Sequence, residues 1–544
     1  MSERDVVFGR DGIPVLTAAE AAAQDRHARE QGGVPERVLM ENAGRSAALV
    51  VDRLYPTGRV VALVGSGNNG GDGLVLLRTL RTWGREVAYV PVGTRPPDPA
   101  LAHGFEIPAL APTPTDPDAL AGVLGGAELL IDALLGTGAS GAPREPMASV
   151  IRAVNASGRP VVALDLPSGV DATTGQVPGE AVRADCTVTF GWPKQGLLFH
   201  PARSYCGRLL AVEIGFPPLA DTGAEGASVP GGGRVFPGAE LITPGWARAR
   251  LPRRPPTAHK GSAGRVLVVA GREGMAGAAL IAAEAALRAG AGYVWLASAP
   301  GNRVPLQTAL PDAIFVDYTD RRALAAVAEQ AAAVLLGPGL GVDDVARELL
   351  EYVLAATPGK PTLLDADALS LVASDAELLE RAVAGRELVL TPHPGEMRRL
   401  TGLGVDAIVA DPVGVAREYA RSRGCVVVLK GMPSVVAAPG APVLINTVGS
   451  SDLARAGMGD QLAGVIAAQL AAGSVGGAER GSLGRTAAGL GLFYSGRAAA
   501  LAGLGRSLGP RDVSAQLSRA FVDPGATASP LGLPFITFDQ SPRW

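Results

Sequence analysis

Two successive series of short apolar segments constrain this chain more than any other feature of its sequence. The first series lies within residues 1 to about 220, and the second begins near residue 260; "RVVALVG" at 59–65 and "RVLVVAG" at 265–271 are examples. Most of these segments are separated by stretches long enough for a helix. Apolar strands joined by helical crossovers are typical of parallel sheets covered on both faces. The sequence therefore predicts two α/β units, with ligand loops after the carboxyl ends of the strands.

The length of the chain agrees with more than one unit, because 544 residues exceed what a single core accommodates. Helical patterns at 17–30 and 35–54 precede the first strand, and a Pro-, Gly- and Ser-rich stretch divides the two series. The predicted organisation is a first domain at 1–222, a linker at 223–240, a second domain at 241–522 and a loose C-terminal tail at 523–544.

Composition excludes several classes of function. A net charge of −3 and an aromatic content of 4% argue against nucleic-acid binding. The sequence contains no run of about 18 uncharged apolar residues, so no membrane span is expected. The charged N-terminus "MSERDVVFGRDG" lacks the apolar core of a secretory signal. The three cysteines match no zinc pattern and read as reduced thiols. We therefore expect a cytoplasmic protein with small-molecule partners.

The loop after the first strand of the first series raises the question of a dinucleotide site. It contains G-x-G-x-x-G at Gly65, Gly67 and Gly70. An ordinary dinucleotide-binding domain carries an acidic residue about twenty residues later, at the end of the next strand. Here that strand reads "EVAYVPVGTRP" and ends without one. The polar side chains of "NNGGD" at 68–72 favour a different ligand site over a glycine turn with capping residues.

Two further loops of the first unit follow apolar strands with the same polar character. One carries Asp132 and the glycines of "GTG" at 136–138, and the other carries Asp165, Ser168 and Asp171. A carboxylate in such a position is often only a helix cap. Because the carboxyl ends of parallel strands meet at one edge of a sheet, three such loops favour one polar pocket over separate caps.

Four segments of the first unit resemble the NAD(P)H-hydrate epimerase family: "MENAG" at 40–44, "GSGNNGGDG" at 65–73, "DALLGTG" at 132–138 and "ALDLPSGVDATTG" at 163–175. The resemblance implies a Rossmann-like three-layer domain that epimerises the hydroxyl-bearing carbon of hydrated nicotinamide nucleotides. It implies a substrate site made of Asn68, Asn69, Gly70, Gly71, Asp72, Gly136, Thr137, Gly138, Ala139, Ser140, Gly141 and Ala142. It also implies a potassium ion held by Asn69, Asp132 and Ser168, with Asp165 as the substrate-contacting acid or base.

The most informative stretch of the second unit is "RAGMGDQLAGVIAAQL" at 455–470. Gly457, Gly459 and the following helix N-terminus offer free N–H groups to a transferring phosphoryl group. Asp460 stands where it can take a proton from an attacking hydroxyl. The alternative is a capped core helix that approaches its neighbours closely.

Further segments of the second unit resemble the ADP-dependent NAD(P)H-hydrate dehydratase family, above all "LDADAL" at 364–369 and "TPHPGEMRRL" at 391–400. The resemblance implies a ribokinase-like α/β fold, ADP as the co-substrate and Mg²⁺ on its phosphates, although the sequence displays no trio of carboxylates for that ion. The implied substrate contacts are Ala278, Gly339, His393 and the catalytic base Asp460. The implied nucleotide contacts are Lys430, Gly431, Met432, Pro433, Ser434 and Gly459.

The second unit departs from this family's usual pattern at several positions. Ser450 and Ser451 replace an Asn-Pro pair, Met458 replaces a small hydroxyl residue, Asp312 replaces a glutamate, and Ser434 replaces a threonine. These changes bear on nucleotide preference and rate, while the glycines and Asp460 remain.

The sequence thus predicts a fused, homo-oligomeric enzyme of metabolite repair. It would epimerise hydrated NADH and NADPH and then dehydrate the S form with ADP, releasing AMP and phosphate. One alternative is a ribokinase-type small-molecule kinase with an N-terminal accessory domain. Another is a first domain that senses a nucleotide or binds a partner without catalysis.

Overall fold

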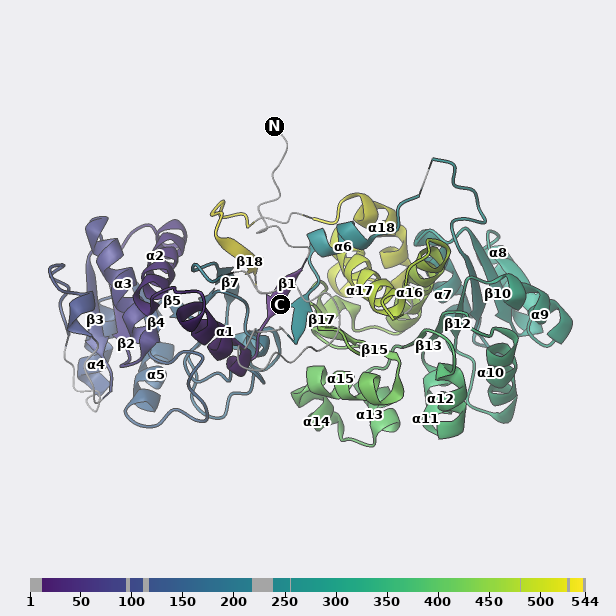
Figure 1. Cartoon of the computed structure of the whole chain (residues 1–544), viewed down its shortest axis with the longest axis horizontal. Helices are drawn as coiled ribbons and strands as arrows, with labels where there is room; N and C mark the ends of the chain where they lie inside the picture. Colours follow the sequence, from purple (N-terminus) through teal and green to yellow (C-terminus); the bar gives the residue numbers. More distant parts are fainter. Residues whose placement is uncertain are drawn as a thin grey trace. The chain divides into compact units, whose positions relative to one another are not determined.

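The computed structural model of this chain describes residues 12–93, 98–110, 117–217, 238–254, 256–479, 481–525 and 529–541. The described residues of Met1–Ala239 and Thr527–Arg543 form one compact unit, and those of Glu240–Ala526 form a second. Figure 1 presents the chain with its element labels. The predicted linker at 223–240 lies outside the described residues except for its end, where strand β8 (Ala239–Leu241) begins.

The first unit contains a sheet whose parallel strands match the apolar runs of the first series. Its strands are β2 (Val60–Val64), β3 (Val87–Pro91), β4 (Leu129–Ala133), β5 (Val161–Leu164), β6 (Cys186–Phe190), β7 (Arg208–Val212) and β18 (Ile536–Gln540). Their order is β18-β7-β6-β5-β4-β2-β3, and only β18 runs antiparallel to its neighbour within the described sheet. The strand order reverses between β2 and β4, and ligands bind at such a switch point in open α/β sheets.

Helices cover both faces of this sheet. The helices of the first unit are α1 (Ala18–Glu30), α2 (Glu36–Leu54), α3 (Asn68–Thr82), α4 (Pro117–Gly125) and α5 (Met147–Ala156). Side chains of α2 and α3 pack with one face of the strands, and side chains of α4 and α5 pack with the other. The predicted three-layer α/β architecture of the first unit is therefore confirmed, as are the helices expected at 17–30 and 35–54.

The C-terminal segment corrects our expectation of a loose tail at 523–544. Residues Ile536–Gln540 form β18 and pair with β7 of the first unit, and Ile536 is buried in the core of that unit. Arg208 of β7 donates from Nε and Nη2 to the two oxygens of Asp539 at 2.8 and 2.7 Å. A short Pro-rich sequence does not reveal such a strand, because its pairing partner lies more than 300 residues away.

We expect a chain that ends at residue 525 to lose at least about 2 kcal/mol of stability in the first unit. Burying one isoleucine side chain contributes about 1.5–3 kcal/mol, and the edge of β7 also loses its hydrogen-bonded neighbour. The test is amide hydrogen exchange within Arg208–Val212, combined with thermal unfolding. A chain that ends at residue 541 keeps β18 and is the matched control. Equal protection of β7 in the two shortened chains would contradict this prediction.

The second unit is built on a larger mixed sheet. Its strands are β8, β9 (Arg265–Val269), β10 (Tyr293–Ser298), β11 (Ile314–Asp317), β12 (Ala333–Leu336), β13 (Thr362–Leu364), β14 (Leu388–Leu390), β15 (Val426–Leu429), β16 (Ser434–Ala437) and β17 (Val443–Asn446). Within this unit they follow the order β8-β17-β16-β15-β14-β13-β12-β9-β10-β11. The strands from β9 to β15 pair in parallel, whereas β16 is antiparallel to both β15 and β17. The apolar runs of the second series predict every parallel strand except β11; these runs are "RVLVVAG", "GYVWLAS", "AVLLGPG", "PTLLDAD", "ELVLTPH" and "CVVVLKG". The antiparallel strands β16 and β17 were not predicted.

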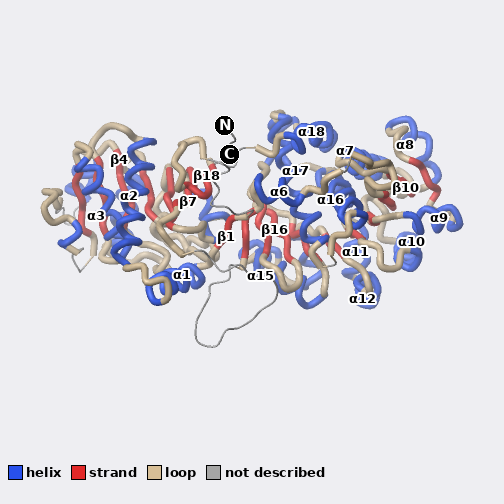
Figure 2. The backbone as a smooth tube through the Cα atoms, turned by 45° about the horizontal axis from the view of Figure 1, so that its top comes forward, coloured by secondary structure: helices blue, strands red, loops and turns tan. Residues whose placement is uncertain are grey.

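Two sets of helices cover this larger sheet, as Figure 2 illustrates. One set includes α6 (Pro244–Arg250), α7 (Ala276–Arg288), α16 (Met458–Val475), α17 (Leu483–Ala502) and α18 (Pro510–Val522). The other helices of the unit are α8 (Arg303–Ala309), α9 (Arg321–Gln330), α10 (Asp344–Ala356), α11 (Asp367–Ala373), α12 (Ala376–Val383), α13 (Pro394–Thr401), α14 (Val405–Ala410) and α15 (Pro412–Arg423). The sheet and its two helical layers confirm the predicted α/β architecture.

Small side chains allow α7 and α16 to approach each other closely. A Cβ atom added to Gly464 of α16 would lie 2.2 Å from the carbonyl oxygen of Ala282 in α7. Both helices are rich in alanine along their buried faces. This close packing explains how two Ala- and Gly-rich segments form the centre of a core. No helix among the described residues is long and apolar enough to cross a membrane.

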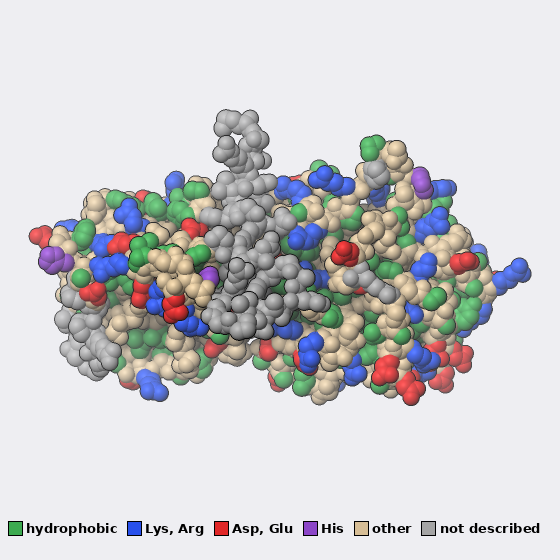
Figure 3. All heavy atoms as spheres, viewed as in Figure 1, with side chains coloured by type: hydrophobic (Ala, Val, Ile, Leu, Met, Phe, Trp, Pro, Cys, Tyr) green, Lys and Arg blue, Asp and Glu red, His purple; other side chains and the backbone are tan. Residues whose placement is uncertain are grey.

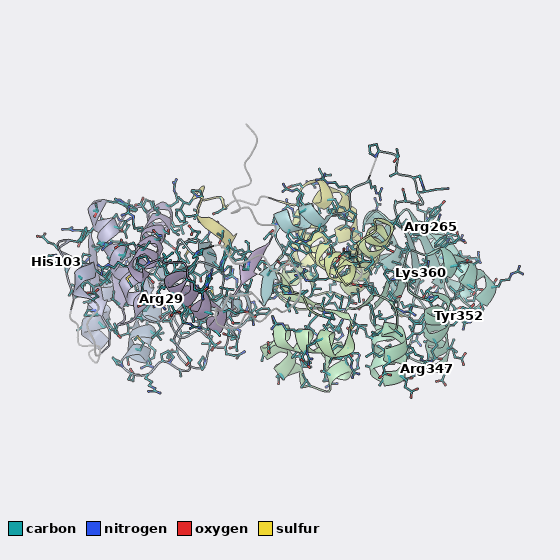
Figure 4. All side chains as sticks on the ribbon, in the orientation of Figure 1. Arg29, His103, Arg265, Arg347, Tyr352 and Lys360 are labelled. Atoms are coloured by element: carbon teal, nitrogen blue, oxygen red, sulfur yellow. The ribbon has the colours of Figure 1, made fainter. Side chains whose placement is uncertain are left out.

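Polar contacts connect the peripheral helices of the second unit. Arg347 and Tyr352 project from α10 and are labelled in Figure 4. Arg347 donates to Asp375 at the start of α12 at 2.9 Å, and the Tyr352 hydroxyl donates to the Arg321 carbonyl of α9 at 2.7 Å. These bonds fix the outer helices without reaching the candidate site.

Candidate functional sites

A cavity of about 890 Å³ lies at the switch point of the first sheet. Its wall is formed by the loops after β2, β4 and β5, by α1, and by the loop after β6. The predicted residues that line it are Asn68, Asn69, Asp72, Gly136, Thr137, Gly138, Ala139, Ser140 and Asp165. One polar pocket therefore unites the three loops, as the sequence analysis expected.

Four residues expected at this site do not line the cavity. Gly70 lies behind the loop, where an added Cβ atom would be 2.0 Å from the Gly65 carbonyl oxygen. Gly71 lines a neighbouring hollow of about 400 Å³ beside Asn68. Gly141 and Ala142 follow the cavity-lining loop, and Ala142 instead packs near Gly179. The role of Gly70 is thus to permit close approach of the backbone.

Asp165 is the carboxylate most strongly held in this cavity. It follows β5 with a φ of +65°, in the left-handed region that aspartate tolerates better than most residues. Lys194 donates from Nζ to Asp165 Oδ1 at 2.6 Å, and the Thr137 amide and hydroxyl donate to Oδ2. Burial opposes ionisation, but the Lys194 ammonium and these hydrogen bonds outweigh it and hold the pKa of Asp165 below its usual value. Asp165 is therefore a carboxylate at neutral pH.

Lys194 was not predicted as a functional residue. It follows β6 in "FGWPKQG", and its side chain is almost fully buried. Besides Asp165, its ammonium donates to the Thr189 hydroxyl at 3.0 Å and to the Phe190 carbonyl at 2.7 Å. A lysine placed directly after an apolar strand was the available signal, because buried lysines require a partner.

Asn69, Asp132 and Ser168 form a buried oxygen-rich cluster at the cavity, since Asn69 and Ser168 both bond to the backbone of Leu135. Ser168 donates from its hydroxyl and its amide to Asp132 at 2.6 and 2.8 Å. The Asn69 amide donates to the carbonyl oxygens of Leu135 and Leu164 at 3.0 and 3.1 Å. Burial raises the pKa of Asp132 to about 6 against the opposing Ser168 hydrogen bonds. The structure thus brings together the three residues that the sequence analysis assigned to a potassium ion.

Helix α1 forms one wall of the cavity and is anchored at its start. The Ala18 amide donates to the Thr173 hydroxyl at 2.9 Å, and the Leu16 amide donates to the Pro193 carbonyl at 3.0 Å. Near its end, Arg29, labelled in Figure 4, pairs with Asp25 at 3.0 Å. The helix is therefore tied to the two loops that carry Asp171 and Lys194.

The second unit contains a cavity of about 610 Å³ at the N-terminus of α16. The predicted residues that line it are His393, Lys430, Gly431, Met432, Ser434, Gly459 and Asp460. Gly457 precedes α16 with a φ of +86°, which requires a residue without Cβ for an unstrained turn. The first amides of α16 are thereby presented as a helix N-terminus suited to an anion.

A buried ion pair lies against this helix N-terminus. Lys430 donates from Nζ to Asp365 Oδ1 at 2.8 Å, and Glu396 Oε2 lies 3.7 Å from the same ammonium. A Cβ atom added to Gly459 would be 3.4 Å from Lys430 Nζ, so glycine leaves room for this charge. Burial lowers the pKa of Lys430, but Asp365 and Glu396 outweigh it and raise the pKa above its usual value. Lys430 is therefore a fixed cation beside the anion site.

Asp460 stands in the first turn of α16, close to this ion pair. Burial, assisted by the negative charge of Asp365, raises the pKa of Asp460 to about 7. A carboxylate with such a pKa can accept a proton and release it near neutral pH. Its environment therefore suits a general base.

The remaining predicted substrate contacts occupy two places. His393 begins α13, where its Nδ1 accepts hydrogen bonds from the Gly395 and Glu396 amides at 3.0 and 3.4 Å. Ala278 of α7 adjoins Gly339 after β12, because a Cβ atom on Gly339 would be 3.1 Å from that of Ala278. Neither Ala278 nor Gly339 lines the cavity at α16, and Pro433 does not line it either.

Comparison with known proteins covers both units. The family model described as NAD(P)H-hydrate dehydratase matches residues 266–505, and the model described as YjeF-related protein N-terminus matches residues 36–196. A bifunctional NAD(P)H-hydrate repair enzyme of Moorella thermoacetica is 37% identical over 83% of this chain and 87% of its own length. The enzyme of the same description from Escherichia coli is 37% identical over 82% of this chain and 83% of its own length. The chain belongs to the bifunctional NAD(P)H-hydrate repair enzyme family.

Solved structures resemble the second unit of this family member. A ribokinase-like superfamily protein of Enterococcus faecalis is 27% identical, with a TM-score of 0.47, over 53% of this chain and 96% of its own. An ADP/ATP-dependent NAD(P)H-hydrate dehydratase of Bacillus subtilis is 28% identical, with a TM-score of 0.43, over 52% of this chain and 97% of its own. The predicted family is confirmed by the two family models and the curated relatives, and the predicted α/β fold class agrees with the two sheets and their helical layers.

Sequence reasoning missed the charged partners that complete both sites of this repair-enzyme family member. In the second unit these are Asp365 and Glu396, which hold Lys430. Both belong to motifs that were recognised, "LDADAL" and "TPHPGEMRRL", but no role was assigned to them. Their position after the apolar strands β13 and β14 was the available signal, because such positions adjoin the ligand edge of the sheet.

Proposed function

We propose that this protein repairs hydrated nicotinamide nucleotides with two activities, an epimerase in the first unit and an ADP-dependent dehydratase in the second. The observation that carries the proposal is similarity to bifunctional repair enzymes along most of the chain, combined with a partly buried carboxylate that lines a cavity in each unit. The substrates are the R and S hydrates of NADH and NADPH, and the products of the second step are NAD(P)H, AMP and phosphate.

In the first unit, Asp165 begins the reaction as a base. It removes the proton of the hydroxyl on the hydrated ring carbon, so that the carbon–nitrogen bond of the hemiaminal breaks and a carbonyl forms. The ring nitrogen gains a proton, and reclosure on the opposite face of the carbonyl produces the other epimer. Lys194 and Thr137 hold the carboxylate in place during both steps. One positioned acid–base group contributes about 100- to 10,000-fold to such a reaction.

A potassium ion fits the cluster of Asn69, Asp132 and Ser168. Asn69 Oδ1 is buried and has no hydrogen-bond partner among the described residues, which leaves one oxygen free for a cation. The Asp132 carboxylate and the Ser168 hydroxyl supply further oxygens, the donor type that hard cations prefer. When bound, the ion would supply positive charge beside the cavity that Asn69 lines. That this cluster holds potassium remains a proposal.

In the second unit, Asp460 takes the proton of the substrate hydroxyl as that oxygen attacks the terminal phosphorus of ADP. The oxygen–phosphorus bond to AMP breaks, while Lys430 and the amides at the start of α16 stabilise the transferring phosphoryl group. The ring nitrogen then expels phosphate from the adjacent carbon. Loss of a proton from the next carbon restores the double bond of NAD(P)H.

The described residues do not supply a protein cage for the expected Mg²⁺. No group of three His, Cys, Asp or Glu side chains with metal-binding geometry occurs among them. Asp365 and Glu396, two acids beside the cavity of the second unit, already face Lys430.

The test of the proposed function uses purified protein, a mixture of R and S hydrates of NADH, and ADP. We expect all of the hydrate to return as NADH, at a rate above that of spontaneous epimerisation. The absorbance of NADH in the near ultraviolet measures this return. Recovery that stops at the S fraction would contradict an active first unit. Formation of AMP with a stable phosphorylated product would instead identify a kinase.

The remaining expectations about partners and location stay predictions. These are a homo-oligomeric state, a cytoplasmic location and the absence of a nucleic-acid partner. On the face seen in Figure 3, basic and acidic side chains are interspersed over both units. A shift in elution on a sizing column measures the oligomeric state.

A further inference from the structure

Three buried polar side chains line the cavity of the second unit without taking part in the chemistry proposed above. They are Asn446 at the end of β17, Gln461 in α16 and Ser495 in α17, with exposed fractions of 5%, 1% and 6%. Asn446 Oδ1, Gln461 Nε2 and Ser495 Oγ are buried and have no hydrogen-bond partner among the described residues. Leaving such atoms unpaired is unfavourable, so unpaired groups in a cavity wall require a partner, which a bound ligand can supply.

The three side chains belong to one region of the wall. Helices α16 and α17 pack side by side in opposite directions, since an added Cβ on Gly473 would meet Leu483 and one on Gly491 would meet Ile466. The same register places Gln461 opposite Ser495. The Cβ of the next residue, Gly496, would lie 2.3 Å from the Val448 carbonyl oxygen, which also accepts from Asn446 Nδ2 at 2.8 Å.

The hydrogen-bonding capacity of this region is specific. Because Asn446 Nδ2 is engaged by Val448, its free atom is an acceptor, whereas the free atom of Gln461 is a donor. The Ser495 hydroxyl can act as either. The same wall contains the apolar side chains of Val448, Leu453, Leu462 and Leu492. A flat aromatic ring with an amino group beside a ring nitrogen matches both properties.

The cavity also indicates which ligand carries that ring. Its wall includes Lys430, Gly431, Met432, Ser434 and Gly459, all residues expected to contact the nucleotide. Of the residues expected to contact the hydrate, His393 and Asp460 belong to this wall, whereas Ala278 and Gly339 do not. Ser450, Ser451 and Met458, where the chain departs from the usual family pattern, line this same wall.

We propose that Asn446, Gln461 and Ser495 recognise the adenine base of the phosphoryl donor. The adenine amino group donates to Asn446 Oδ1, a ring nitrogen accepts from Gln461 Nε2, and Ser495 completes the polar edge. This inference rests on the proposed function of the second unit, because that function identifies the cavity as the ADP site. It adds the residues by which this chain selects the base.

The test compares Gln461→Leu with Gln469→Leu, a matched change in the same helix. Gln469 is also buried but donates to the Ala289 carbonyl at 3.4 Å and lies outside the cavity. For Gln461→Leu we expect ADP to bind about 10- to 100-fold more weakly by calorimetry, in the absence of hydrate. The thermal midpoint without ligand should be equal or higher, because an unpaired buried group has been removed. Gln469→Leu should lower the midpoint and leave ADP affinity unchanged.

A second arm examines the base itself. The wild-type protein should bind purine riboside 5′-diphosphate, which lacks the amino group, about 10-fold or more weakly than ADP. Equal affinities, or unchanged ADP affinity in Gln461→Leu, would overturn the inference while leaving dehydration by the wild-type protein intact. A raised KM for the hydrate and not for ADP would also overturn it, because the carboxamide or the adenine of the hydrate would then be the occupant. If the wild-type protein failed to convert the hydrate to NADH while Gln461→Leu still weakened ADP binding, that result would overturn only the proposed function.

Discussion

Asp460→Asn is expected to abolish dehydration while epimerisation continues. The substitution keeps the shape of the side chain at the start of α16 but removes the group that accepts the hydroxyl proton. Loss of a positioned general base costs about 100- to 10,000-fold in rate. Dehydration is measured as the return of NADH absorbance from S hydrate with ADP. Epimerisation is measured on the same preparation by chromatographic separation of the R and S hydrates.

The pH dependence provides an independent check on Asp460. Its carboxylate is the active form of a base, and its pKa is raised to about 7, first by burial and then by Asp365. We expect kcat/KM to rise about tenfold per pH unit below 7 and to level off above it. Asp320→Asn is the control, since Asp320 caps α9 through the Ala323 amide and asparagine also caps helices. Wild-type dehydration by Asp460→Asn would refute the assignment.

Asp165→Asn is expected to abolish epimerisation and leave dehydration of the S hydrate intact. Asparagine cannot take the hydroxyl proton, and we expect a loss of about 100- to 10,000-fold. The change also leaves the Lys194 ammonium buried without its carboxylate, which costs about 3–5 kcal/mol for a broken buried pair. Chromatographic interconversion of the hydrates measures the activity, and thermal unfolding measures the stability.

The double variant Asp165→Asn with Lys194→Met separates these two effects. Removing both charges should restore most of the lost stability, because no unpaired ion remains, but it should not restore epimerisation. Lys194 and the hydrogen bonds outweigh burial and lower the pKa of Asp165, so this carboxylate stays ionised around neutral pH. Titration of Asp165 should therefore cause little change in the wild-type epimerisation rate around neutral pH. Recovery of epimerisation in the double variant would argue against a catalytic role for Asp165.

Local patterns in the sequence predicted most of the fold and much of each site. The apolar runs became β2 to β7 and most parallel strands of the second sheet, because a strand buried on both faces must be apolar along its length. The polar loops after those strands converge in one cavity in the first unit, since parallel strands place their carboxyl ends at one edge. Asp165 was found in one of these loops, and Asp460 was found in the glycine-rich turn that begins α16; both lie in environments that change their pKa.

What the sequence by itself determined is therefore the α/β architecture, the family and the loops that carry the chemistry. Only the tertiary structure decided which residues meet across long distances in the chain. It joined β18 to β7, Lys194 to Asp165, Asp365 to Lys430, and Asn446 to the wall formed by Gln461 and Ser495. The physical reason is that periodicity reports which face of an element is buried, whereas the partner of a buried polar group depends on packing between elements that have no common local pattern.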